Sequence, residues 1–103
     1  MSTKVFVFYN LKKGVDIEEF KKWSREVDQP TCSKMPACHS FEVFLVKGEK
    51  LGRPFQMIVE DIEVESWNAW QDTLKSDAFS KVREEWPLFG DAESSRAIFC
   101  EKI

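Results

Sequence analysis

Large apolar side chains occupy both faces of the first predicted strand, residues 4–9. Side chains alternate across a β-strand, so Val5 and Val7 share one face while Phe6 and Phe8 share the other. A surface strand of a small monomer has one polar face, whereas this strand needs apolar cover on both. We therefore expect helices on one face and a second copy of the chain on the other.

Apolar positions then recur at helical spacing. A first helix is predicted from Ile17, after the N-cap residue Asp16, to its end at Pro30. A second helical period covers 63–75 and, after a break near Asp77, continues over 79–86 until Pro87. The buried stripes comprise Ile17, Phe20, Trp23 and Val27, then Val64, Trp67, Trp70, Leu74, Phe79, Val82 and Trp86.

Three further strands are predicted at 40–46, 55–60 and 95–103. The order β-α-β-β-α-β predicts an α+β, ferredoxin-like fold in one domain, residues 1–103, with a four-stranded antiparallel sheet and helices on one face. Alternation assigns to the helix side Val5, Val7, Phe41, Val43, Leu45, Met57, Val59, Ala97 and Phe99. It assigns to the opposite side Phe6, Phe8, Asn10, Ser40, Glu42, Phe44, Gln56, Ile58, Glu60, Ile98 and Cys100.

This second set mixes aromatic side chains with carboxylates. A monomer does not tolerate so apolar an exposed face, and isolated polar groups among apolar ones are typical of a ligand pocket. A chain of 103 residues with 14% aromatics can also scarcely bury them all alone. Two sheets packed face to face in a homodimer are therefore predicted to enclose a chamber.

Charge and cysteine content exclude several classes of partner. The 15 basic and 18 acidic residues are interspersed, which disfavours nucleic acid. The chain has neither an apolar run of the roughly 20 residues that span a bilayer nor a signal peptide, so a cytoplasmic protein without a membrane partner is expected. An odd number of cysteines favours free thiols, and the spacing of Cys32, Cys38 and His39 matches no common zinc site, so no metal is expected.

The chain also resembles a known family over its whole length. A helix, a short polar motif, a loop proline and a strand follow one another at Trp23, Asp28-Gln29-Pro30, Met35-Pro36-Ala37 and Phe41-Glu42-Val43. This pattern resembles the dimeric α+β barrel superfamily and, within it, the RedY-like proteins of the HapK type, which are encoded with the genes for prodiginine pigments. The resemblance implies cofactor-independent cyclisation or condensation of a pyrrole or indole intermediate of a prodigiosin-type pathway.

Two other functions stay open. A non-catalytic dimeric protein that binds or scaffolds a reactive pigment precursor fits the same fold, as does a cofactor-free monooxygenase. Haem-degrading relatives carry an iron-binding His in the second helical region, and this chain has no His there, so a cofactor is not expected. The predicted ligand is a small aromatic N-heterocycle.

Four residues are candidates for acid–base chemistry. His39 carries an imidazole, a side chain suited to general acid–base chemistry, and precedes the second strand. Glu42 and Glu60 are predicted to share the apolar sheet face, where burial raises the pKa of a carboxyl group. Several barrel families carry a His before a Pro after the first helix, and this chain offers Asp28 there as a base. The alternatives for these residues are a solvated loop position for His39 and ion pairs at the dimer seam for Glu42 and Glu60.

Ligand contacts are predicted on the same sheet face. The candidates, two of them stacking aromatics on the first strand, are Phe6, Phe8, Asn10, Phe44, Gln56 and Ile58. The helical spacing of the four tryptophans instead favours the core or an interface. Cys100 is expected to act as a small buried hydrophobe.

Overall fold

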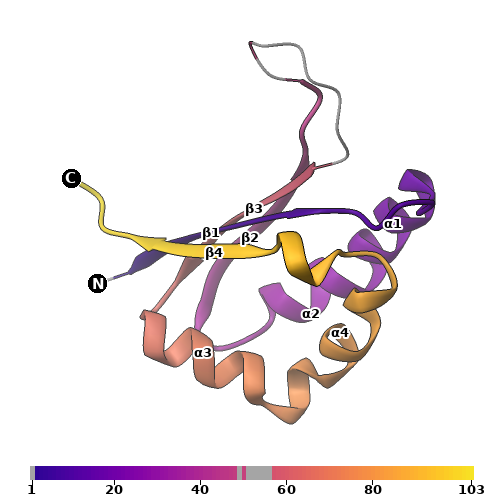
Figure 1. Ribbon diagram of the computed structural model, residues 1–103. Helices are drawn as coiled ribbons and strands as arrows, with labels where there is room; N and C mark the ends of the chain where they lie inside the picture. The colour runs from indigo at the N-terminus through magenta and orange to yellow at the C-terminus, as the bar shows by residue number, and fades with distance from the viewer. Residues whose placement is uncertain (1, 49, 51–56) are drawn as a thin grey trace.

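The fold is a four-stranded antiparallel sheet with its helices on one face (Figure 1). The computed structural model describes residues 2–48, 50 and 57–103. The strands are β1 (Thr3–Asn10), β2 (Cys38–Leu45), β3 (Met57–Val64) and β4 (Arg96–Cys100). They lie in the order β2-β3-β1-β4, and each neighbouring pair is antiparallel. The predicted ferredoxin-like α+β fold is confirmed, although the strand predicted over 95–103 pairs only over Arg96–Cys100.

Two helical segments form the second layer. The first comprises α1 (Ile17–Trp23), the π-helical turn η1 (Ser24–Asp28) and α2 (Gln29–Ser33). The second comprises α3 (Trp67–Lys75), the 3-10 turn η2 (Asp77–Phe79), α4 (Ser80–Glu85) and the 3-10 turn η3 (Trp86–Leu88). A further 3-10 turn, η4 (Ala92–Ser94), leads into β4. The predicted break near Asp77 is confirmed, because Ser76 ends α3 in an extended conformation.

The first helical segment continues through Pro30, where the sequence predicted its end. The η1 turn widens the helix, and the Gln29 N–H donates to the Ser24 carbonyl five residues back. Pro30 then lies in the first turn of α2, directly after this widened turn. The wide turn places Ser24 and Asp28 in the buried interior.

The prediction for the third strand was wrong in length and in parity. β3 extends to Val64, and the helix predicted from 63 begins only at Trp67, after the N-cap Ser66. Glu60 pairs with Val7 and Val43, both on the helix side, so it faces the helices and lies opposite to the side of Glu42. Ile58, which pairs with Tyr9, also faces the helices. Met57 and Val59, predicted to pack on the helices, are on the opposite side.

The core lies between the sheet and the helices. Val5, Phe20, Ile62 and Val64 are almost completely buried there. The opposite sheet face, called the outer face below, carries Lys4, Phe6, Phe8, Asn10, Ser40, Glu42, Phe44, Met57, Val59, Asp61, Glu63, Arg96, Ile98 and Cys100. Among the described residues no helix is long and apolar enough to cross a membrane.

Candidate functional site

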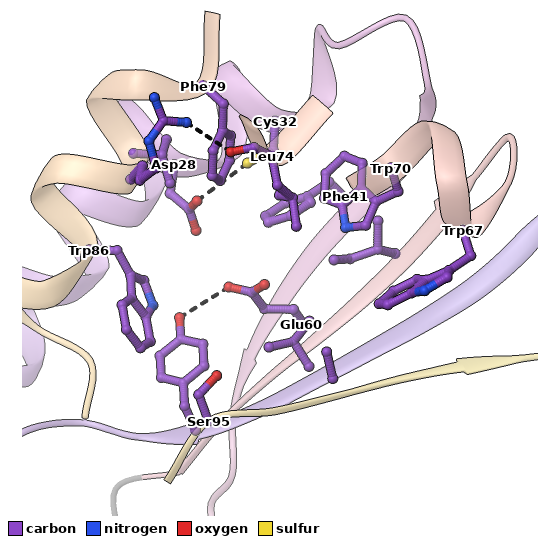
Figure 2. Close-up of a pocket in the computed structure, with 16 residues that line it drawn as sticks. Asp28, Cys32, Phe41, Glu60, Trp67, Trp70, Leu74, Phe79, Trp86 and Ser95 are labelled. Atoms are coloured by element: carbon purple, nitrogen blue, oxygen red, sulfur yellow. Dashed lines mark hydrogen bonds between the residues drawn. The ribbon is translucent and has the colours of Figure 1, made fainter. Parts of the chain in front are cut away.

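A cavity of about 370 Å³ lies between the sheet and the helical layer (Figure 2). This volume falls near the lower end of the roughly 300–1,000 Å³ that ligand pockets occupy. All four strands and both helical segments contribute to its walls. The lining residues are Val7, Tyr9, Asp28, Cys32, Phe41, Glu60, Ile62, Trp67, Trp70, Leu74, Phe79, Val82, Arg83, Trp86, Ser95 and Ala97.

Aromatic rings form much of the wall. Trp67 and Trp70 reach the cavity from α3 and Trp86 from η3 (Figure 2). The Trp67 ring stacks on Phe99 of β4 with centroids 4.6 Å apart, and Trp86 packs edge-on against Tyr9 at 5.0 Å. Such rigid, flat surfaces favour a planar aromatic ligand.

Asp28 brings a carboxyl group into this apolar space from the π-helical turn. Its side chain is buried, with 2% exposure, and its Oδ1 accepts a hydrogen bond from the Cys32 thiol at 3.5 Å. The other oxygen, Oδ2, is buried and has no hydrogen-bond partner among the described residues. Burial raises the pKa of Asp28 to about 6, although the bond from Cys32 opposes the rise. An unsatisfied buried oxygen costs stability, so Oδ2 is a strong candidate to accept a hydrogen bond from a ligand.

Glu60 supplies a second carboxyl group from the sheet. Its side chain is also buried, and the Tyr9 hydroxyl donates to its Oε2 at 3.1 Å. Burial, and secondly the charge of Asp28, raise the pKa of Glu60 to about 8, against the opposite effect of the Tyr9 bond. Burial also raises the pKa of Tyr9, so its hydroxyl stays protonated and acts as a donor.

The two carboxyl groups point into one cavity from opposite layers (Figure 2). Burial raises the pKa of both groups, and the charge of Asp28 raises that of Glu60 further, so near neutral pH the pair favours a state that holds one proton between the two carboxyl groups. A carboxyl pair that holds one proton offers both a proton donor and a proton acceptor. The arrangement therefore provides one general acid and one general base in a largely apolar pocket.

The other predicted acid–base residues are not part of this cavity. His39 is exposed, and its Nδ1 lies 3.9 Å from Glu63 Oε2 at a register shift in β2. Glu42 is exposed on the outer face, opposite Asp61 in the register. Thus Asp28 and Glu60 come together, whereas His39 and Glu42 lie elsewhere.

The predicted ligand contacts also lie outside the cavity. Phe6, Phe8, Asn10 and Phe44 are on the outer face as expected. Ile58 is buried on the helix side and lines a smaller groove beside α1. Gln56 lies outside the described residues.

Sequence reasoning missed most of the cavity wall. The helical spacing assigned the tryptophans to the core or an interface. Three of them pack in or against the core and also line the pocket. Tyr9 was a detectable signal, because a tyrosine on the helix side of a strand needs a partner for its hydroxyl. Cys32 lies one helical turn after Asp28. Because Pro30 predicted the end of the helix between them, the sequence did not indicate that these two residues are neighbours.

Comparison with solved structures shows the ferredoxin-like fold. HapK from Hahella chejuensis superposes with a TM-score of 0.73 at 20% identity, covering 100% of this chain and 93% of that one. A putative antibiotic biosynthesis monooxygenase from Nitrosomonas europaea gives 0.73 at 12% identity, covering 99% and 90%. A dimeric protein of unknown function with a ferredoxin-like fold, from Bacteroides fragilis, gives 0.69 at 14% identity, covering 98% and 96%.

The family follows from the sequence itself. The profile described as REDY-like protein HapK matches residues 3–103, and the chain belongs to this family. A search of curated proteins gave no significant match. The predicted membership of the RedY-like, HapK-type proteins is therefore confirmed.

Proposed function

We propose that the protein binds a pyrrole or indole intermediate of a prodigiosin-type pathway in the inner cavity and promotes its cofactor-independent cyclisation or condensation. The observation that carries this proposal is the pair Asp28 and Glu60, two buried carboxyl groups with raised pKa values that line one aromatic-walled pocket. A flat heterocycle would stack on the tryptophans and donate its ring N–H to Asp28 Oδ2.

The chemistry needs only proton transfers besides the new bond. An electron-rich ring carbon attacks an electrophilic C=N or C=O carbon, so a C–C bond forms while the π bond to the heteroatom breaks. Glu60 gives its proton to that heteroatom, and Asp28 removes a proton from the attacking ring. In a cyclisation the product is an isomer of the substrate. In a condensation the two substrates first form an adduct, and its protonated heteroatom then leaves as water or an amine. Solvent returns the two carboxyl groups to their starting states. Confinement by the pocket supplies orientation.

Turnover assays on variants of the two carboxyl groups test the proposal. Purified protein is incubated with bipyrrole and bis-indole intermediates, with and without oxygen, and products are followed by mass spectrometry against a protein-free control. Asp28→Asn and Glu60→Gln are each expected to lower turnover by roughly 10²–10⁴-fold, the usual contribution of general acid–base catalysis. Glu84→Gln, an exposed carboxyl group outside the cavity, is the matched control and should leave turnover unchanged.

The same assay separates the rival functions. A product formed equally without oxygen supports the proposal, whereas a strict oxygen requirement would identify a cofactor-free monooxygenase. A ligand that raises the melting temperature and emerges unchanged would identify a binding protein. Full turnover in both Asp28→Asn and Glu60→Gln would remove the assigned roles.

We also propose that the protein is a homodimer joined through its outer faces. Phe44 and Ile98 are 49% and 43% exposed there, which is costly for a monomer. The similar protein from Bacteroides fragilis is described as dimeric. In this arrangement the outer-face aromatics form the interface, and each protomer keeps its own inner cavity.

A further inference from the structure

Arg83 places a cation at the edge of the inner cavity. It lines the cavity and is also exposed, so it lies where the cavity meets solvent. Its Nη1 donates to the carbonyls of Leu74 and Ser76, at 2.8 and 3.2 Å, where α3 ends. These two bonds hold the guanidinium group in a fixed position beside the pocket.

Both hydrogen bonds are donated by Nη1, one of the three guanidinium nitrogens. Nε and Nη2 form the other edge of the planar group, and this edge matches the two oxygens of a carboxylate. Among the described residues no acidic side chain makes an ion pair with Arg83. A held arginine with a free bidentate edge at a pocket mouth is suited to a ligand anion.

We infer that Arg83 binds a carboxylate of the ligand, so that the pocket takes aromatic N-heterocycles that carry a carboxylic acid group. The inference rests on the proposed use of this cavity for an N-heterocycle. Such a ligand pairs with both polar groups of the site, because its N–H can donate to Asp28 Oδ2 while its carboxylate accepts from Arg83. Trp70 and Phe79 also line the cavity, and apolar surroundings strengthen a charge-assisted hydrogen bond.

Arg83 could instead serve as a structural cap, because arginine side chains often bond the last carbonyls of a helix. Capping and ligand binding make different predictions. If Arg83 only caps the helix, replacing it lowers the stability of the protein but does not change the relative affinity for charged and neutral ligands. A carboxylate-binding residue sets the preference for the charged ligand.

Calorimetric titration with three probes tests the inference: indole-2-carboxylate, the neutral indole-2-carboxamide and indole. In the wild-type protein the carboxylate should bind at least about ten-fold more tightly than the carboxamide, the gain expected from a hydrogen-bonded charged pair. Arg83→Gln should reduce this preference to within about two-fold, and Arg83→Lys should retain part of it. Lys81→Gln removes an exposed cation from the same helix outside the cavity, and should keep the full preference.

Equal affinity for carboxylate and carboxamide in the wild-type protein overturns the inference, as does an unchanged preference in Arg83→Gln. Because the first comparison needs no variant, it stands even if Arg83→Gln folds poorly. Binding of indole that weakens in Asp28→Asn, with no gain from the carboxylate, would leave the proposed function intact while removing the role of Arg83. Failure of all three probes to bind would contradict both.

Discussion

Glu60 links the stability of the protein to its chemistry at the scale of a single residue. A carboxyl group on the buried face of a strand is costly when ionised, and this cost holds the pKa of Glu60 high. The Tyr9 hydroxyl donates to one of its oxygens and partly opposes this rise, but burial outweighs the hydrogen bond, so the fold favours the neutral acid. The same environment that disfavours the charge keeps a proton available for donation at neutral pH.

This environment predicts a pH-dependent stability. Between its ordinary pKa of 4.5 and about 8, Glu60 holds more protons in the folded state than in the unfolded state. The free energy of unfolding should therefore fall as pH rises from about 5 to 9, by roughly 2–4 kcal/mol. The titration of Asp28 lowers the free energy of unfolding by a smaller amount over this range, and most of that decrease has occurred by its pKa of about 6.

Glu60→Gln isolates the contribution of this carboxyl group, because the amide oxygen can still accept the Tyr9 bond. We expect its denaturation midpoint to change much less between pH 6 and 9 than that of the wild-type protein. Glu84→Gln should follow the wild-type profile. Parallel profiles for Glu60→Gln and the wild-type protein would show that Glu60 does not titrate with a raised pKa.

The elements differ in how far the sequence determines them. Helical spacing and strand alternation identify β1, β2, β4 and the second helical segment, since each has a regular apolar stripe, although that segment begins at Trp67 and β4 ends at Cys100. The π-helical turn breaks this rule, because Pro30 predicts an end where one widened turn lets the helix continue. β3 was misread because apolar residues occupy both parities at 57–59 and Glu60 suggested an outward face. The alternation that settles its register lies in the following segment, at Asp61 to Val64.

The junction after η3 shows how an element boundary shapes the pocket. Gly90 bridges to Leu11, and its N–H donates to the Trp86 carbonyl at 2.9 Å. A Cβ atom at position 90 would overlap Cζ2 and Cε2 of the Trp86 ring. Glycine at this position therefore lets the indole pack against the chain and complete the cavity wall.

Gly90→Ala should destabilise the protein by about 1–3 kcal/mol, the cost of overpacking a buried site, and should lower the melting temperature accordingly. In a Trp86→Phe background the smaller ring leaves room, so the same substitution should cost less than half as much. Denaturation of the four proteins in this cycle measures the coupling. Equal costs in the two backgrounds would contradict the proposed overlap.

For the whole molecule, the sequence predicted the fold and a ligand chamber between two copies, but not the cavity that the chain itself forms between its sheet and its helices. Outward aromatics such as Phe8 suggested a chamber between two copies. The described chain instead leaves about 370 Å³ between its own sheet and helices. Such a void depends on how the side chains fit across the layers, as with Trp67 and Trp86, which patterning does not specify.

The outer face is then free to serve as an interface, and this gives a prediction about assembly. Ile98 lies on the outer face at the middle of the edge strand β4, opposite Phe6 in the register, whereas Leu88 is 68% exposed in η3. A buried, unpaired charge is costly, so Ile98→Glu should disrupt a dimer that packs outer face to outer face. Light scattering after size exclusion should give the dimer mass for the wild-type protein and Leu88→Glu at micromolar concentration, and the monomer mass for Ile98→Glu. A monomeric wild-type protein, or a dimer that survives Ile98→Glu, would show that this face does not hold two copies together.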